Sequence, residues 1–325
     1  QKVKVGVIGC GGIAMGHVDR LLTMPEVEVT GLMDTDPERL AGTVKRFPQL
    51  DGVAMFDDHE KLIKQGDLDA VVICSPHNVH RKQILDGLEA GLHVLTEKPM
   101  VCSIEDAEAV MKAEKKAGTV VGISYQRHAQ GEYQFIRNAI AGGKPGEVLF
   151  VAAFQGQEWL ESQKGKWRQV MEISCGGQLN DSGSHLIDII LWMTDLAVEE
   201  VSAQINNCGR EVDINSAVSM RFKGGALGTL SVVGSCPIWW EDITISCKKW
   251  AFFIRQGQLT YTTGRRGEVH HVDGFNYGAP SADHNFVDAI LGRGEVLAPT
   301  TCGLRTIELT EAAWKSAESG KPVKL

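Results

Sequence analysis

A glycine-rich turn after the first apolar segment constrains the fold of this chain more than any other feature. Residues 3–8 are apolar and predict a buried strand, and the turn that follows has the pattern GxGxxA before an apolar helix. In such a turn the first glycine permits the tight bend, the second lets a ligand approach the backbone, and the alanine lets the helix pack on the strand. The helix N-terminus then offers free N–H groups to a phosphate. The residues expected to line this site are Gly9, Gly11, Gly12 and Ile13.

The first 125 residues alternate short apolar segments with amphipathic ones. Runs such as residues 70–74 are typical of parallel strands that are covered on both faces. One helix is expected to begin after Ser103, which caps it, and to end at Gly118. This alternation predicts an α/β Rossmann domain with a doubly wound parallel sheet over residues 1–124.

The pattern changes near residue 125, where apolar segments begin to follow one another without helices between them. Direct joining favours an antiparallel sheet. We therefore predict an α+β domain over residues 125–325, with a large, mostly antiparallel open sheet, for substrate binding and oligomerisation. The C-terminal helix is expected to pack back toward the first domain. Helices are expected at residues 131–141, 182–193, 285–291 and 304–317.

An acidic residue stands where a nucleotide-binding domain needs one. Asp34 ends the second predicted strand, at the distance from the turn where a carboxylate binds the hydroxyl groups of the adenosine ribose. A carboxylate there repels a 2′-phosphate, and no arginine follows it directly, so we expect NAD rather than NADP. The alternative interpretation is that Asp34 and Asp36 only cap the helix that starts at Pro37.

Two further segments carry candidate catalytic groups. Glu97-Lys98-Pro99 lies just past a predicted parallel strand, at the sheet edge where ligands of open α/β sheets bind. Lys98 is therefore a candidate to polarise a substrate oxygen. Asp181 and His185 are four residues apart at a predicted helix start and should share one face. The histidine can take the proton of an alcohol, and the aspartate can orient its ring.

The alternatives for this second segment are structural or metal-binding roles. Asp181 could be a helix cap and His185 a buried core histidine. A metal site from Asp181, His185 and Asp188 is conceivable, but no further ligand is evident and nicotinamide chemistry needs no metal. We therefore expect no metal.

Taken in order along the whole chain, these motifs resemble those of the glucose–fructose oxidoreductase / inositol dehydrogenase / MocA (Gfo/Idh/MocA) family. The resemblance implies that Lys98, Asp181 and His185 surround the hydroxyl group being oxidised. It also implies that further residues line the cofactor, namely Ser75, Asn78, His80, Glu97, Lys98, Trp167 and Arg168.

Two positions depart from the family pattern. Cys175 replaces the first of three glycines before the segment with Asp181. Alignment on Tyr133 places His128 where many members carry an arginine, so Arg127 and His128 are both candidates to contact the substrate.

Composition restricts the partners. The net charge of −8 argues against a nucleic-acid-binding surface, and no apolar stretch reaches the length of a membrane span. A cytoplasmic location is expected, although the chain begins with Gln1 and an upstream segment could have been removed. An open sheet with one uncovered face needs a partner, so a homo-oligomer, a dimer or tetramer, is expected. Trp239 and Trp240 are expected to pack on the sheet or in a subunit interface rather than against a sugar.

These features together predict an NAD-dependent oxidoreductase. It would transfer hydride between nicotinamide and a secondary hydroxyl of a sugar, sugar derivative or cyclic polyol, the substrate class being implied by the resemblance. One alternative is an enzyme that recycles a tightly bound NAD and acts on glycosides through a transient keto sugar. A second is an NAD-binding regulator without catalytic activity.

Overall fold

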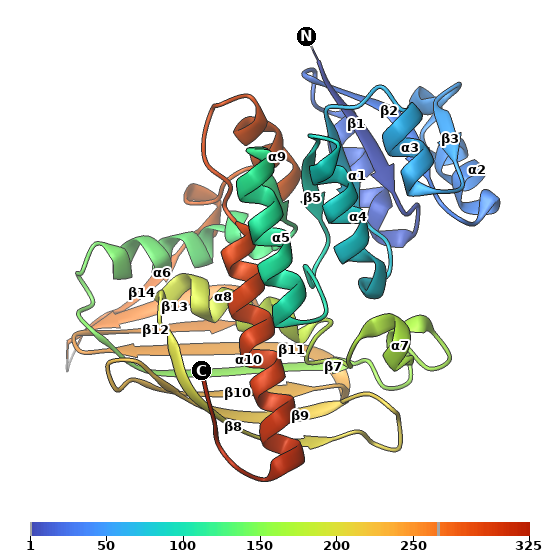
Figure 1. Cartoon of the computed structure of the whole chain (residues 1–325). Helices are drawn as coiled ribbons and strands as arrows, with labels where there is room; N and C mark the ends of the chain where they lie inside the picture. Colours follow the sequence, from blue (N-terminus) through green and yellow to red (C-terminus); the bar gives the residue numbers. More distant parts are fainter. Residues whose placement is uncertain (1, 265–266) are drawn as a thin grey trace. The chain divides into compact units, whose positions relative to one another are not determined.

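The structure is a computed structural model, and it describes residues 2–264 and 267–325. The chain forms two compact units (Figure 1). The first unit comprises residues 1–125 and 280–303, and the second comprises residues 126–279 and 304–325. Within the described residues, no helix is both long and apolar enough to cross a membrane.

The first unit contains a six-stranded sheet in which every pair of neighbouring strands is parallel. The strand order β3-β2-β1-β4-β5-β6 is that of a doubly wound Rossmann sheet, which confirms the predicted fold class. The strands are β1 (Val3–Ile8), β2 (Val27–Met33), β3 (Ala54–Phe56), β4 (Ala70–Ile73), β5 (His93–Thr96) and β6 (Val121–Ile123).

Local sequence explains why the helices of this unit begin and end where they do. The side chain of Ser103 accepts a hydrogen bond from the backbone N–H of Asp106, and Gly118 ends the same helix at a φ of 68°. Both features confirm the predictions for that segment. The helices are α1 (Gly12–Leu22), α2 (Pro37–Arg46), α3 (His59–Gln65), α4 (His77–Glu89), α5 (Ile104–Ala117) and α9 (Ala282–Ile290).

Helix α9 belongs to a segment that returns to the first unit from late in the sequence. Its side chains Phe286 and Val287 are part of the hydrophobic core that also contains the β1 residues. The backbone N–H of Ile123 donates to the carbonyl of Ala298 over 2.9 Å, so the segment also pairs with the end of β6. Residues 280–303 therefore complete the core of a domain whose other residues lie at the N-terminus.

The second unit contains a nine-stranded sheet in the order β14-β13-β12-β11-β7-β10-β9-β8-β15. Its pairs are antiparallel except for β7 with β10, which are parallel. The strands are β7 (Val148–Glu158), β8 (Val198–Asn206), β9 (Asn215–Phe222), β10 (Leu227–Val233), β11 (Ser235–Cys247), β12 (Trp250–Arg255), β13 (Gln258–Thr263), β14 (Val269–Val272) and β15 (Val323–Lys324). The mostly antiparallel sheet is the one predicted from the directly joined segments.

One face of this sheet is covered and the other is open. Along β9, exposed and buried side chains alternate strictly from Ser216 to Phe222, as expected when helices cover a single face. Helix α8 (Gly183–Thr194) is almost wholly buried and supplies much of that covering core. The other helices of this unit are α6 (Gly131–Ala141), α7 (Met171–Ser174) and, for most of its length, α10 (Thr300–Ser319).

Candidate functional site

The glycine turn has the conformation that a phosphate-binding turn needs. Gly9 has a φ of +89°, and a Cβ on it would lie 2.8 Å from the backbone of Cys74 at the end of β4. Gly11 is the N-cap of α1, and around Gly12 a Cβ would meet no atom within 4 Å. The helix N-terminus therefore opens onto free space, while Ala14 is fully buried against the sheet. This arrangement fits the pyrophosphate of a dinucleotide.

Asp34 lies beside this turn at the end of β2 and is buried. One carboxylate oxygen accepts the N–H of Cys10 over 2.7 Å, and the other accepts the N–H of Asp36 over 2.9 Å. Asp34 therefore fixes the glycine turn directly, a role that the spacing argument did not include. Asp36 caps α2 by accepting the N–H of Glu38. The alternative interpretation, in which the two aspartates cap this helix, therefore applies to Asp36.

Arg39 is a residue that the sequence reasoning missed. Its exposed guanidinium lies 3.9 Å from the Asp34 carboxylate and the same distance from where a Gly11 Cβ would be. No arginine follows Asp34 directly in the sequence, but the first turn of α2 brings Arg39 back to it. A cation therefore stands beside the carboxylate on which the preference for NAD rests.

The segment after β4 is held to the segment after β5 by a buried histidine. His80 contacts the carbonyl of Pro99 through Nδ1 and the carbonyl of Ser75 through Nε2, each over 2.9 Å. Burial lowers the pKa of His80, and the two carbonyls oppose that effect only in part. Among the other predicted cofactor residues here, the Ser75 hydroxyl donates to Gln83 over 2.5 Å, and Asn78 is exposed. His80 thus positions two loops of the candidate cofactor site.

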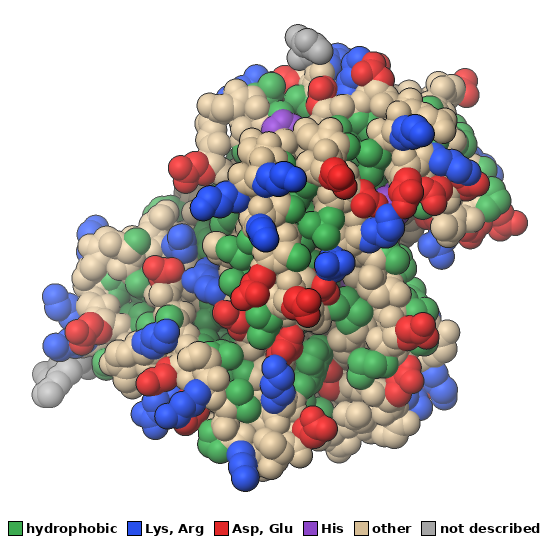
Figure 2. Space-filling view, viewed as in Figure 1, with side chains coloured by type: hydrophobic (Ala, Val, Ile, Leu, Met, Phe, Trp, Pro, Cys, Tyr) green, Lys and Arg blue, Asp and Glu red, His purple; other side chains and the backbone are tan. Residues whose placement is uncertain are grey.

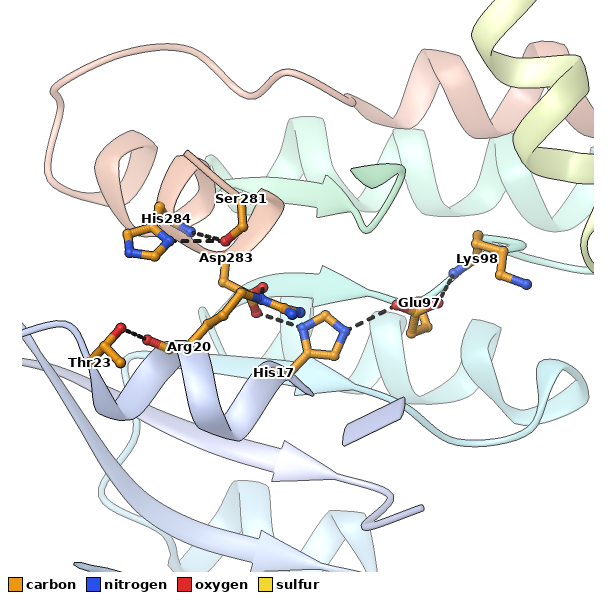
Figure 3. Close-up of polar contacts among 8 residues, drawn as sticks. All are labelled: His17, Arg20, Thr23, Glu97, Lys98, Ser281, Asp283 and His284. Carbon is orange, nitrogen blue, oxygen red and sulfur yellow. Dashed lines mark hydrogen bonds and ion pairs between the residues drawn. The ribbon is translucent and has the colours of Figure 1, made fainter. Parts of the chain in front are cut away.

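Glu97 and Lys98 follow β5 at the same edge of the sheet. One Glu97 oxygen lies 3.0 Å from Nε2 of His17, and the other accepts the backbone N–H of Lys98 over 3.2 Å. The Lys98 side chain is half-buried, and its ammonium points away from His17 (Figure 3). Sequence reasoning missed His17, although it was the polar residue among the buried positions of α1.

In the second unit, Asp181 is buried and held by two donors. Its Oδ2 atom accepts the indole N–H of Trp159 over 3.0 Å and lies 3.1 Å from Nε of Arg168. Helix α8 begins at Gly183, so Asp181 lies in the turn before the helix and His185 lies in its first turn. The helix thus begins one residue after its expected start at Ser182, and the shared face of Asp181 and His185 stays a prediction. The resemblance placed Trp167 and Arg168 near the cofactor. Arg168 pairs with Asp181, and the Arg168 guanidinium lies 4.4 Å from the centre of the Trp167 ring.

A second buried aspartate shapes the glycine segment before Asp181. Asp213 accepts the N–H of Gly177 over 2.9 Å, the N–H of Leu179 over 2.7 Å and the indole N–H of Trp314 over 3.0 Å. Burial raises the pKa of Asp213, and these donors offset part of the rise. A Cβ on Gly177 would lie 1.9 Å from the carbonyl oxygen of Asp213, so only glycine permits this approach.

Cys175, which departs from the family pattern, has a φ of 58° and ends α7. A left-handed conformation is one that glycine adopts without strain, so a glycine would fit this position at least as well as the cysteine.

The two candidate substrate residues of the next segment lie in buried pairs. Arg127 lies 2.5 Å from Glu241 of β11, whose other oxygen accepts the hydroxyl hydrogen of Tyr133 over 3.1 Å. His128 lies 2.6 Å from Asp188 of α8 and stacks on Trp192. Asp188, weighed above as a metal ligand, therefore has a histidine partner from another element.

Gln155 of β7 is the cross-strand neighbour of Glu241 and shares its buried surroundings. Its side-chain amide has no hydrogen-bond partner among the described residues, and neither has the Nη1 atom of Arg127. Buried polar groups are nearly always satisfied, so this group of side chains has hydrogen-bonding capacity left for a ligand. Residue spacing gave no indication of Gln155 or Glu241.

The structure thus gathers the predicted residues into two sets, one in each unit. The glycine turn, Asp34, the Ser75–His80 segment and Glu97-Lys98 lie at the carboxyl ends of parallel strands. The second unit holds Asp181 and Arg168, together with the buried side chains around Arg127, namely Tyr133, Gln155 and Glu241. That Lys98 meets Asp181 and His185 at one substrate stays a prediction.

Comparison with known families defines the class of this protein. The oxidoreductase family GFO/IDH/MocA, described as having an NAD-binding Rossmann fold, matches residues 3–125, and the GFO/IDH/MocA C-terminal domain matches residues 133–252. The class is therefore that of the NAD(P)-dependent oxidoreductases built from a Rossmann domain and a C-terminal domain. The chain belongs to the Gfo/Idh/MocA family, as its motifs indicated.

Curated relatives are distant in sequence. Glucose-6-phosphate 3-dehydrogenase of Bacillus subtilis is 28% identical over 207 residues, which are 62% of this chain and 57% of that protein. Inositol 2-dehydrogenase of Rubrobacter xylanophilus is 26% identical over 237 residues, which are 71% of this chain and 64% of that protein. The match thus spans less than two thirds of the length of either relative.

Solved structures match over the whole chain. The WlbA dehydrogenase from Bordetella pertussis, in complex with NADH and UDP-GlcNAcA, is 24% identical with a TM-score of 0.86, covering 100% of this chain and 98% of that one. Levoglucosan dehydrogenase, in complex with NADH and levoglucosan, is 20% identical with a TM-score of 0.88, covering 100% and 99%. At these identities the similarity establishes the fold alone.

Proposed function

We propose that this protein is an NAD-dependent oxidoreductase that acts on a secondary hydroxyl of a sugar, sugar derivative or cyclic polyol. The observation that carries the proposal is one edge of the Rossmann sheet, where the glycine turn follows β1, Asp34 follows β2 and Glu97-Lys98 follows β5. Ligands of such sheets bind at that edge. The relatives named for glucose 6-phosphate and inositol support the substrate class.

The unsatisfied groups of the second unit also favour a hydroxyl-rich substrate. Gln155 offers a donor and an acceptor, and Arg127 offers a donor, from buried positions. Such groups are costly when they face an apolar molecule, whereas the hydroxyls of a sugar or polyol can pair with them. A purely apolar alcohol is therefore a poor candidate.

In the proposed mechanism, three side chains act on the reacting hydroxyl. NAD, when bound, supplies the nicotinamide that accepts or returns the hydride. His185 takes the hydroxyl proton as general base, and the Lys98 ammonium stabilises the developing alkoxide. Asp181, held by Trp159 and Arg168, positions the substrate and the base.

We further propose that NAD is preferred to NADP and that the protein is a homo-oligomer. Asp34 favours a free ribose hydroxyl, as argued above. The open sheet face supports association, because Phe150 of β7 and Leu227 of β10 are paired and both exposed. Trp239 and Trp240 are also exposed. On the face that Figure 2 shows, basic side chains are interspersed with acidic ones, which is consistent with partners other than nucleic acid.

A panel of sugars and cyclic polyols with NAD, followed by NADH absorbance, tests this function. With a confirmed substrate, His185→Ala should lower turnover by about 10²–10⁴ while NAD affinity changes little, because a positioned base is lost. Lys98→Ala should lower turnover and also weaken NAD binding. His271→Ala, an exposed histidine on β14, is the matched control and should leave turnover unchanged.

Near-normal turnover in His185→Ala would show that the histidine is structural and the mechanism wrong. NAD that stays bound through purification and turns over without net NADH would favour the recycling alternative. NAD binding without turnover on any member of the panel would favour a regulator.

A further inference from the structure

A buried histidine lies between two carboxylates at the rear of the Lys98 segment (Figure 3). Nδ1 of His17 is 2.5 Å from Oδ1 of Asp283, and Nε2 is 3.0 Å from Oε1 of Glu97. The other oxygen of Asp283 lies 2.5 Å from Nε of Arg20. His17 and Asp283 are fully buried and Glu97 is nearly so. All four residues belong to the first unit.

The geometry determines how many protons this cluster carries. A neutral imidazole has one N–H and one lone pair, so it cannot donate to two carboxylates at once. Asp283 also faces Arg20 and is the fixed anion of the group. With both ring nitrogens protonated, two cations and two anions balance, and every contact joins a donor to an acceptor.

The pKa shifts of His17 and Asp283 agree with a doubly protonated His17 ring. Burial disfavours the charged ring, but the hydrogen bonds that the ring donates to Asp283 and Glu97 outweigh this effect and raise the pKa of His17 to about 9. The pKa of Asp283 is lowered although burial opposes this, because His17 and Arg20 stabilise its anion. Two further ionisable side chains interact electrostatically with these carboxylates: Cys74 with Asp283 and Glu97, and His80 with Glu97.

We propose that His17 is a positioning residue for Lys98 and acts through Glu97. The cationic ring holds Oε1 of Glu97, which leaves Oε2 directed at the backbone N–H of Lys98. The orientation of the Lys98 segment is therefore fixed from behind, on the side opposite to its ammonium. This inference rests on the proposed function, in which that ammonium faces the reacting hydroxyl.

The inference also gives the returning segment a part in the site. Asp283 lies 266 residues from His17 in the sequence and reaches it from α9. Without Asp283, the ring has no second acceptor to fix its plane and retain its second proton. The conformation of Glu97 and Lys98 thus depends on residues 280–303 as well as on the N-terminal domain.

Two substitutions of His17 separate the two contacts. In His17→Gln the side-chain amide reaches about as far as Nε2 and can still donate to Glu97. In His17→Asn it reaches only as far as Nδ1, so it can contact Asp283 but not Glu97. His17→Asn should lower kcat about 10–100-fold with little change in the Kd of NAD, because a small misplacement of a catalytic group has effects of that size.

His17→Gln should keep kcat within about threefold, because the hydrogen bond to Glu97 remains, although a neutral one is weaker. His284→Gln is the matched control, since this neighbour of Asp283 contacts only Ser281 in the group that Figure 3 draws. Thermal unfolding of each variant shows whether lost turnover accompanies lost stability. Equal turnover in the Asn and Gln variants would overturn the proposal.

A measurement without substrate tests the charge of the ring. Histidine-labelled protein is titrated by NMR, and the His17 signal is identified by its absence from His17→Gln. We expect His17 to titrate near 9 in the native protein and at lower pH in Glu97→Gln, which loses one acceptor. Titration at or below the ordinary value of about 6.5 would overturn the proposal.

Failure of the proposed enzyme activity can be distinguished from failure of the positioning role of His17. If no sugar or polyol is oxidised, the proposed function fails while the NMR titration still decides the charge of His17. If a substrate is found but His17 is neutral or both variants turn over normally, the positioning role fails alone.

Discussion

Asp283 and Asp213 are aspartates of nearly equal burial, one in each unit, with opposite surroundings. Asp283 is 0% exposed and faces two cations, His17 and Arg20. Asp213 is 5% exposed, and among the described residues its hydrogen-bond donors are neutral: two backbone N–H groups and an indole. The pKa of Asp283 is lowered and that of Asp213 is raised, although burial alone would raise both.

For these two carboxyls, the direction of the pKa shift follows the charge of the partner, because burial is common to both. Cations compensate an anion directly, whereas neutral dipoles offset only part of the desolvation. Each aspartate fixes a segment that carries candidate catalytic groups. The first unit does so with charge, and the second does so with hydrogen bonds to backbone.

Removing the charge of Asp283 should have the largest effect on stability. Asp283→Asn leaves His17 and Arg20 without their common anion, and breaking a buried ion pair costs about 3–5 kcal/mol. Urea unfolding measures the loss. The control is Asp288→Asn on the same helix, whose exposed pair with Arg293 should contribute less than about 1 kcal/mol. Equal losses for the two variants would show that the charges around Asp283 do not stabilise the fold.

The pH dependence of stability should report His17 next. A pKa raised to about 9 means that its contribution is fully present below the unfolded value of 6.5 and is lost as the pH rises through 9. The loss between about pH 6 and pH 10 should approach about 3 kcal/mol. His17→Gln should lack this component, which unfolding curves of both proteins at the two pH values would reveal. If both proteins lost the same free energy of unfolding between the two pH values, His17 would not be a cation in the folded protein.

Asp213→Asn should lower the free energy of unfolding by about 1–2 kcal/mol, which is less than the effect of Asp283→Asn. The amide keeps one acceptor and leaves one donor unsatisfied. Trp314→Phe removes only the indole donor to the same carboxylate and should leave the glycine segment in place. Turnover should fall more in Asp213→Asn than in Trp314→Phe, since Gly177 and Leu179 lead into Asp181. If Asp213→Asn lowered the free energy of unfolding as much as Asp283→Asn does, the charge of the partners would not explain the difference between the two aspartates.

Sequence reasoning found those parts of the site that depend on local spacing. The glycine turn, Asp34 and the end of β5 are set by a strand and the turn that follows it, so their positions can be read along the chain. The alternation of strands and helices likewise predicted the parallel sheet. Each of these features requires only residues that are close in sequence.

Apart from Arg39, which is close to Asp34 in sequence, the missed residues depend on tertiary contacts. Asp283 reaches His17 across 266 residues, and Asp213 reaches Gly177 across 36, and no spacing rule connects either pair. Gln155 and Glu241 are related by strand register, which the sequence does not specify. Among the residues with tertiary partners, His17 gave a signal, a polar side chain on the buried side of a helix, but its partners could not be named.

Asp34 provides the smallest and most specific test, because it resembles Asp213 in accepting two backbone N–H groups but has Arg39 nearby. Asp34→Asn removes the charge that repels a 2′-phosphate while keeping one acceptor for the glycine turn. With Arg39 free to pair with the phosphate, affinity for NADP relative to NAD should rise about tenfold, roughly 1.4 kcal/mol.

Tryptophan fluorescence titrations with both cofactors measure this ratio in the native protein, in Asp34→Asn and in Asp34→Asn combined with Arg39→Ala. The double variant should lose most of the gain, because the cation that binds the phosphate is gone. A native protein that binds NADP as well as NAD would show that Arg39 already outweighs Asp34. An unchanged ratio in Asp34→Asn would mean that Asp34, like Asp213, serves only to hold a loop.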